Sequence, residues 1–233
     1  YSEIEGDFKR VEGRLYRSLR VPPGNRGPLI IIAPILAGAV DNYLACRVFA
    51  RWACQEGISA FYLHQEENIL SDERDGVELE RLLRDSIQDN IKALDLLVER
   101  PDVDRDRLGS LGISMGAIKN VVLAAVEPRL EANVFCLAGG DLPRIFLASR
   151  EKRVVQYLRR RETRDELTRE QIGAEIGRCL EAEPLRFAPS IPSDRSLLFL
   201  GALDNKVPYE TGLALGKSLG EPETFIIPLG HYT

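Results

Sequence analysis

A serine flanked by glycines stands near the middle of the sequence, in Gly112-Ile113-Ser114-Met115-Gly116. A serine hydroxyl is a weak nucleophile at neutral pH, and it attacks a carbonyl carbon only when a neighbouring base takes its proton. That base is commonly a histidine, which a carboxylate holds in place. Downstream of the serine lie Asp204, in GALDNKVP, and His231, in PLGHYT. These residue types could form and break an acyl-enzyme if the fold brings them together.

The elements around Ser114 must hold it in an exposed, sharp turn. Residues 107–113 are predicted to form a buried strand, and residues 116–126 a helix, with Ser114 between them. Gly112 and Gly116 would let neighbouring backbone approach this turn closely. The dipole of the following helix favours negative charge that develops at its N-terminus.

Asp204 and His231 occupy equivalent places in the predicted fold. Asp204 follows a predicted strand at 196–202, and His231 follows another at 224–229. Open α/β sheets bind their ligands at the carboxyl ends of the strands. The other histidine, His64, precedes the serine, and we expect it to be structural or to lie at the rim of the site.

The rest of the sequence predicts strands that alternate with helices. One helix carries Leu44, Val48 and Trp52 at four-residue spacing and ends at Gly57. Further elements are expected as strands at 29–33, 58–64 and 132–140, helices at about 78–99 and 209–220, and antiparallel edge strands within 7–21. This alternation predicts the α/β class, with a mostly parallel sheet covered by helices on both faces.

One segment, 144–188, breaks the alternation. It has no clear strand and is dense in charge, so we expect helices inserted above the sheet. Four of its arginines could favour acidic substrates or could form a solvated helix face: Arg159, Arg160, Arg161 and Arg164.

These motifs give the chain a resemblance to serine hydrolases of the α/β-hydrolase fold, over nearly its whole length. The matching stretches are GISMG after a strand, LDNKVP after the penultimate strand and GH after the last strand. The resemblance implies Ser114 as the nucleophile, His231 as the general base and Asp204 as its orienting acid. Asp141 is an alternative acid, because some members of the family place the acid at that strand end.

The resemblance also implies a domain organisation and an oxyanion hole. Residues 1–143 and 189–233 would form the core, and 144–188 a helical cap. The oxyanion would be held by the N–H of Met115 and by a second N–H from the loop APILAGAVDNY. Leu36 is the expected second donor and Ile35 the alternative, although this loop lacks the usual histidine motif.

Composition narrows the possible partners. The 233 residues are 44% hydrophobic and carry a net charge of −5, which argues against nucleic acid, and no apolar run is long enough to cross a membrane. The four cysteines lack zinc-type spacing and are expected to be buried, reduced thiols: Cys46, Cys54, Cys136 and Cys179. No cofactor or metal is expected, and the substrate should be a small molecule.

Location and oligomeric state stay open. A soluble, cytoplasmic protein is favoured, but the chain begins at Tyr1 without an initiator Met, so a removed signal or anchor is an alternative. The chain stops two residues after His231, where the family fold adds a helix, so we expect a less covered sheet at that end.

The expected activity is hydrolysis of a carboxylic ester, or of a thioester or amide, in the manner of a carboxylesterase. Two alternatives use the same fold. One is a binding protein without turnover, and the other is an acyltransferase that passes the acyl group to an acceptor other than water.

Overall fold

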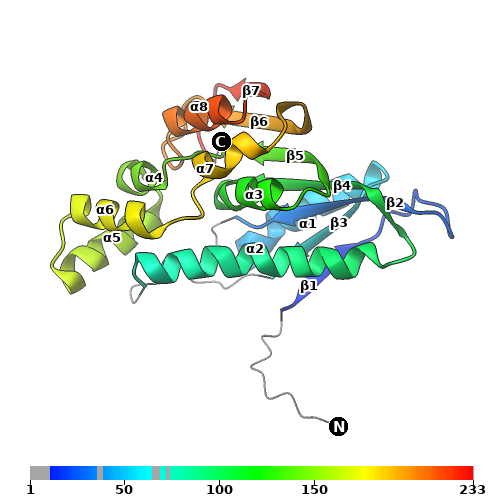
Figure 1. The fold of residues 1–233 in the computed structure, drawn as a ribbon, viewed down its shortest axis with the longest axis horizontal. Helices are drawn as coiled ribbons and strands as arrows, with labels where there is room; N and C mark the ends of the chain where they lie inside the picture. The colour runs from blue at the N-terminus through cyan, green and yellow to red at the C-terminus, as the bar shows by residue number, and fades with distance from the viewer. Residues whose placement is uncertain (1–10, 36–38, 65–68, 72–73, 233) are drawn as a thin grey trace, which may run out of the picture.

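The structure is a computed structural model that describes residues 11–35, 39–64, 69–71 and 74–232. Its centre is a seven-stranded sheet in the order β1-β3-β2-β4-β5-β6-β7 (Figure 1). The strands are β1 (Gly13–Tyr16), β2 (Gly27–Ala33), β3 (Ser59–Leu63), β4 (Val103–Ile113), β5 (Leu130–Cys136), β6 (Ser196–Gly201) and β7 (Glu223–Ile227). In this sheet β1 pairs with β3 in the antiparallel direction, and all the other neighbouring strands pair in parallel. The predicted α/β class with a mostly parallel sheet is therefore confirmed.

Helices connect the strands. They are α1 (Ala39–Gln55), α2 (Gly76–Val98), α3 (Met115–Val126), α4 (Leu142–Ala148), α5 (Lys152–Asp165), α6 (Arg169–Cys179), α7 (Pro184–Phe187) and α8 (Tyr209–Ser218), with short 3-10 turns η1 (Ala188–Ser190) and η2 (Ser193–Arg195). None of the helices in the described ranges is both long enough and apolar enough to cross a membrane.

Alternate residues of the central strands enter different cores, because successive side chains of a strand point to opposite faces. Leu29 and Ile31 of β2 pack into the larger core with α2 and α3. Ile32, with Ala60 of β3, packs against α1 in a separate cluster. The two faces of this part of the sheet are thus covered by different helices, as the sequence predicts.

The α1 helix forms where the spacing of Leu44, Val48 and Trp52 predicts it, but these residues do not form its most buried side. Leu44 and Trp52 are 52% and 57% exposed, whereas Cys46 and Ala50 are buried against the sheet. The regular spacing of Leu44, Val48 and Trp52 thus indicates a helix but does not indicate which side of it is buried.

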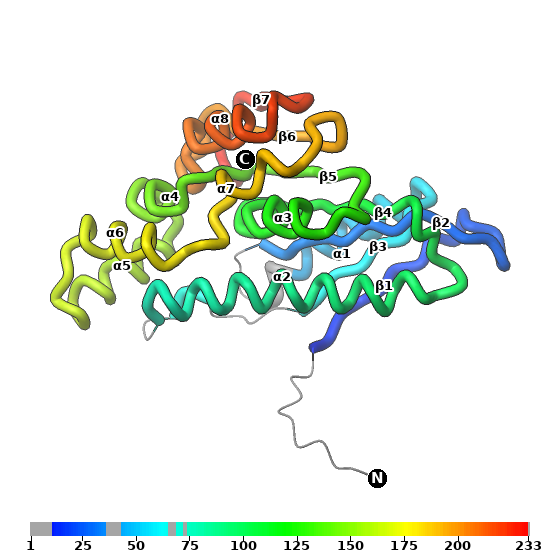
Figure 2. The backbone as a smooth tube through the Cα atoms, viewed as in Figure 1, coloured from blue at the N-terminus to red at the C-terminus, as the bar shows by residue number. Residues whose placement is uncertain are grey.

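Between β5 and β6 the chain leaves the sheet, runs through α4 to α7 and then returns (Figure 2). Figure 1 shows α4, α5 and α6 gathered at one end of the sheet, the end toward which the β5 arrow points. The charged segment 144–188 thus forms helices, as expected. These helices lie near the strand ends that carry the candidate site.

Two other predictions were only partly right. Within the described residues, the expected antiparallel edge strands reduce to β1, and residues 1–10 lie outside that part. All four cysteines are free thiols, but only Cys46 is buried, and Cys54, Cys136 and Cys179 are partly exposed. The last strand, β7, is exposed along all of its residues.

Candidate active site

Ser114 sits in the turn between β4 and α3 with φ 56° and ψ −126°, a left-handed backbone that a serine rarely adopts. Such a conformation costs of order 1–3 kcal/mol and persists only where the surroundings enforce it. A Cβ at Gly116 would overlap the carbonyl oxygen of Ala33, and a Cβ at Gly112 would lie 2.5 Å from Ala117 Cα. Glycine is therefore required at both positions for β2, β4 and α3 to close around the serine.

The structure brings His231 and Asp204 to this serine. His231 Nε2 lies 2.9 Å from Ser114 Oγ, and His231 Nδ1 lies 2.6 Å from Asp204 Oδ2. The side chains of His231 and Asp204 are only 3% and 2% exposed. These contacts join loops that follow β4, β6 and β7, so the strand ends do converge as expected.

Asp204 divides its two oxygens between two tasks. Oδ1 accepts backbone N–H bonds from Lys206 at 2.8 Å and from Val207 at 3.1 Å. Oδ2 is left for His231 Nδ1. When Nδ1 carries the proton of that bond, Nε2 has a free lone pair and can accept the hydroxyl proton of Ser114.

The alternative acid, Asp141, is placed elsewhere. It is the N-cap of α4, with φ 62°, and its side chain accepts the N–H of Arg144. Its own N–H donates to Glu183 Oε1 at 2.8 Å. Asp141 therefore organises the start of α4, and the carboxylate beside His231 is that of Asp204.

Met115 is the first residue of α3, so its N–H has no carbonyl partner within its own helix and is free to serve a ligand. Ile35 and Met115 both line the pocket that contains Ser114. Leu36, the expected second oxyanion donor, lies outside the described residues.

His64 directly follows β3 and is not among the residues that line this pocket. Its ring lies 4.6 Å from that of Tyr43, and its Nδ1 is 4.0 Å from the carboxylate of Glu12. Its position agrees with the structural role expected for it.

Two residues near the site were not identified from sequence. The hydroxyl of Tyr232 donates to Glu151 Oε2 at 2.6 Å, and the Tyr232 ring stands edge-on to His231 with centroids 4.8 Å apart. Burial, with a smaller effect of the bond to Glu151, raises the pKa of the Tyr232 hydroxyl well above its usual value. The adjacency of Tyr232 to His231 was the only sequence signal, because the partner lies 81 positions away.

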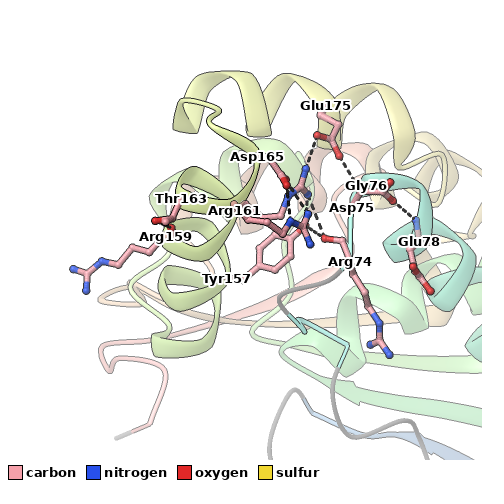
Figure 3. Close-up of polar contacts among 11 residues, drawn as sticks. Arg74, Asp75, Gly76, Glu78, Tyr157, Arg159, Arg161, Thr163, Asp165 and Glu175 are labelled. Atoms are coloured by element: carbon pink, nitrogen blue, oxygen red, sulfur yellow. Dashed lines mark hydrogen bonds and ion pairs between the residues drawn. The ribbon is translucent and has the colours of Figure 1, made fainter.

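Of the four arginines singled out in 144–188, Arg161 belongs to a buried ion network. Arg161 is buried, and it donates to Glu175 Oε2 at 2.7 Å, to the Tyr157 hydroxyl at 2.8 Å and to Asp165 (Figure 3). Burial alone would lower the pKa of Arg161, but these carboxylates raise it above its usual value. The other oxygen of Glu175 accepts the N–H of Gly76, at the start of α2.

For Arg161 both expected roles are therefore wrong, because it is buried in an ion network and does not line the pocket at Ser114. Arg164 is exposed, as the solvated alternative expects, and pairs with Asp165 of its own helix without lining that pocket. In Figure 3, Arg159 points away from the network, as a solvated residue would.

Comparisons with known proteins identify the fold of the chain. No known family's sequence model matches the chain. A polyketide transferase, ATR5 of Stachybotrys chlorohalonatus, is 27% identical over 128 residues, 54% of this chain and 41% of its own length. The chain thus spans well under half of that relative.

Solved structures match over almost the whole chain. Acetyl xylan esterase 1 of Thermoanaerobacterium sp. aligns with 96% of this chain and 74% of its own, at TM-score 0.65 and 19% identity. The α/β hydrolase GrgF of Penicillium sp. aligns with 96% of this chain and 92% of its own, at TM-score 0.62 and 16% identity. The chain has the α/β-hydrolase fold.

Proposed function

We propose that this protein is a serine hydrolase that cleaves a carboxylic ester through an acyl-enzyme, with thioesters and amides as further candidate substrates. The observation that carries the proposal is the continuous path from Ser114 Oγ to His231 Nε2, and from His231 Nδ1 to Asp204 Oδ2, at 2.9 and 2.6 Å. Both contacts are within hydrogen-bond distance, and the serine stands in a strained turn at a helix N-terminus, as nucleophilic catalysis needs.

In the first half of the reaction, Ser114 Oγ bonds to the ester carbonyl carbon while its proton passes to His231 Nε2. The N–H of Met115, with a second N–H at Leu36 or Ile35, stabilises the oxyanion. The tetrahedral intermediate collapses, the ester C–O bond breaks, and the departing alkoxide takes the proton from His231. In the second half, water adds to the acyl carbon and gives a proton to His231. The bond from the acyl carbon to Ser114 Oγ then breaks, Oγ takes that proton back from His231, and the carboxylic acid leaves. Asp204 holds the imidazole and stabilises its charged form.

The helices between β5 and β6 serve as a cap in this proposal, with 144–188 as the cap and the two flanking segments as the core. Ile145 of α4 and Val154 of α5 line the pocket beside Ser114, so these helices would contact a bound substrate. Glu80 of α2 accepts the N–H of Ala182 at 3.0 Å, which ties the end of the segment to the core.

An acyltransferase is the second candidate, because the curated relative is named as a polyketide transferase. It would use the same residues for the first half of the reaction, and an acceptor hydroxyl or amine would then replace water. Competition between water and added alcohols for the acyl-enzyme separates the two. The ester-hydrolase proposal is preferred because acetyl xylan esterases are among the structures with this fold.

The first test is the intact mass of the protein after incubation with a fluorophosphonate, for the wild type and for Ser114→Ala. One adduct on the wild type that is absent from the variant supports the proposal. If the wild type does not react, the smaller reagent phenylmethylsulfonyl fluoride tests whether the pocket is merely closed. If folded protein does not react with this smaller reagent either, the result would favour a binding protein without turnover.

A further inference from the structure

A pocket of about 140 Å³ opens beside Ser114 and His231, and its inner wall is apolar. The wall is built from the loop after β2, from α3, α4 and α5, and from the loop after β6. Its apolar residues include Ile35, Met115, Ile118, Ile145, Val154 and Val207. The last four of these are at least 94% buried, since none is more than 6% exposed.

The charged residues that line the pocket, Glu151 and Lys206, are partly exposed and hydrogen-bonded. Glu151 accepts from the Tyr232 hydroxyl, and Lys206 Nζ donates to the carbonyl oxygen of Arg150 at 2.5 Å. Ser149 Oγ accepts the N–H of Glu151 at 3.1 Å. Among the described residues of the inner wall, none carries a charge. A charged group in this space would lose its water without gaining a partner, so the pocket suits a neutral, apolar group.

The acyl part and the alcohol part of an ester extend from Ser114 in different directions. His231 must give its proton to the leaving oxygen, so the alcohol part lies on the side of His231. Met115 and Ile118 lie in the first turn of α3, directly after Ser114, and both line the pocket, as does His231. The apolar wall on α3 thus belongs to residues that follow the serine, which keeps the acyl group after the alcohol has left.

We propose, on the basis of the function proposed above, that this pocket binds the acyl group and selects esters of neutral, apolar acids of about six or seven carbons. The size follows from the volume, since a dry apolar cavity of roughly 150 Å³ takes one benzene molecule. Hexanoyl and benzoyl groups match this space. An acetyl group leaves most of it empty, and a dodecanoyl chain exceeds it.

Ile118 sets the depth of the pocket. A second, smaller space of about 10 Å³ adjoins it, and Met115 and Ile118 are the residues that line both. Leu142, Phe146 and other apolar residues line the rest of that space. Shortening Ile118 would join the two spaces and lengthen the acyl site along an apolar wall.

The test measures kcat/KM for p-nitrophenyl esters that share one leaving group, with acyl parts from acetyl to dodecanoyl and with benzoyl. Each methylene that enters the pocket should raise kcat/KM by about fourfold. The expected profile peaks at hexanoyl and benzoyl, at least tenfold above acetyl and dodecanoyl. A second series holds the acyl part as acetyl and lengthens the alcohol, and it should vary much less.

Variants of the wall sharpen the test. Ile118→Ala should move the optimum toward octanoyl or decanoyl, and Ile145→Phe should move it toward acetyl and propionyl. The matched control is Val122→Ala, one turn further along α3, which is 4% exposed and does not line the pocket. It should weaken the fold comparably and leave the acyl optimum unchanged.

The same preparations are labelled with the fluorophosphonate, so two kinds of failure can be told apart. Without labelling of Ser114, the proposed function itself fails, and the acyl site with it. With labelling, a profile that is flat in the acyl series, that peaks at acetyl, or that depends only on the alcohol part overturns the acyl site and leaves the hydrolase proposal standing.

Discussion

The Tyr232 hydroxyl and the Glu151 carboxylate form a hydrogen bond of 2.6 Å that joins the residue after His231 to the N-cap of α5. Because the Tyr232 ring also packs edge-on against the His231 imidazole, this bond restrains the loop that carries the imidazole. The lining of the pocket and the orientation of His231 are thus coupled through one side chain.

Tyr232→Phe removes the hydroxyl and keeps the ring. A hydrogen bond of this kind is worth about 1 kcal/mol, so kcat/KM for an ester should fall by roughly fivefold, mainly in kcat. The rate of fluorophosphonate labelling should fall in parallel, since it also depends on His231. Tyr209→Phe is the control, because Tyr209 begins α8 and is not among the pocket residues. Equal rates for Tyr232→Phe and wild type would show that the bond does not restrain His231.

Asp204→Asn should reduce kcat by roughly 10³–10⁴-fold, because an amide at this position favours the wrong tautomer of His231. The matched variant is Asp141→Asn, at the acid position that the sequence left as an alternative. Asparagine is as good an N-cap as aspartate, so α4 should be retained and the rate should stay within about twofold of wild type.

Steady-state kinetics of these two variants decide between the acids. A large loss in Asp141→Asn with a small one in Asp204→Asn would reverse the assignment. Circular dichroism of both proteins would establish that the loss is not one of folding.

The convergence of the candidate residues could be predicted better than the surfaces around them. Ser114, Asp204 and His231 were expected to meet because each follows a predicted apolar strand, and parallel strands bring their carboxyl ends together whatever lies between. The buried face of α1 could not be predicted. Leu44 and Trp52 repeat as regularly as Cys46 and Ala50, and only packing against the sheet decides which pair faces inward.

The charged helices show a second limit. Arg161 lies on the same face of α5 as Val154, Tyr157 and Leu158, but an arginine at such a position is not expected to be buried unless its partner is known. Its burial depends on Glu175, which belongs to the next helix. A contact of this kind arises from the angle between two helices, and helical periodicity carries no information about that angle.

Arg161→Met should destabilise the protein strongly. It leaves Glu175 and Asp165 without the buried cation that faces them, and breaking such a pair costs about 3 kcal/mol or more. For a chain of this size the midpoint of thermal unfolding should drop by roughly 6–12 °C. Arg159→Met, two residues earlier on the exposed side of α5, should change the unfolding free energy by less than about 0.5 kcal/mol.

Differential scanning calorimetry of both variants tests this. The change should also loosen the attachment of Glu175 to Gly76, so proteolysis between α5 and α6 should accelerate in Arg161→Met alone. Matching midpoints for the two variants would mean that the network contributes nothing to stability.

Lys119, on α3, gives the fold a dependence on pH. Burial lowers the pKa of its ammonium group from 10.5 to about 7, partly offset by the neighbouring Cys46. Between these two values the unfolded chain keeps a proton on Lys119 that the folded chain has released. The free energy of unfolding should therefore rise with pH above neutrality, by up to about 1.4 kcal/mol per pH unit from this group.

Lys119→Met should remove that slope and stabilise the protein most below pH 7, where the wild type must hold a charged ammonium in its core. Urea unfolding at pH 6.5, 7.5 and 8.5 measures the effect as the difference between variant and wild type, since titration of the Cys46 thiol in the unfolded chain is common to both proteins. Lys217→Met, on the exposed side of α8, is the control and should keep the wild-type slope. If Lys119→Met keeps that slope as well, Lys119 remains charged when folded and some other group titrates.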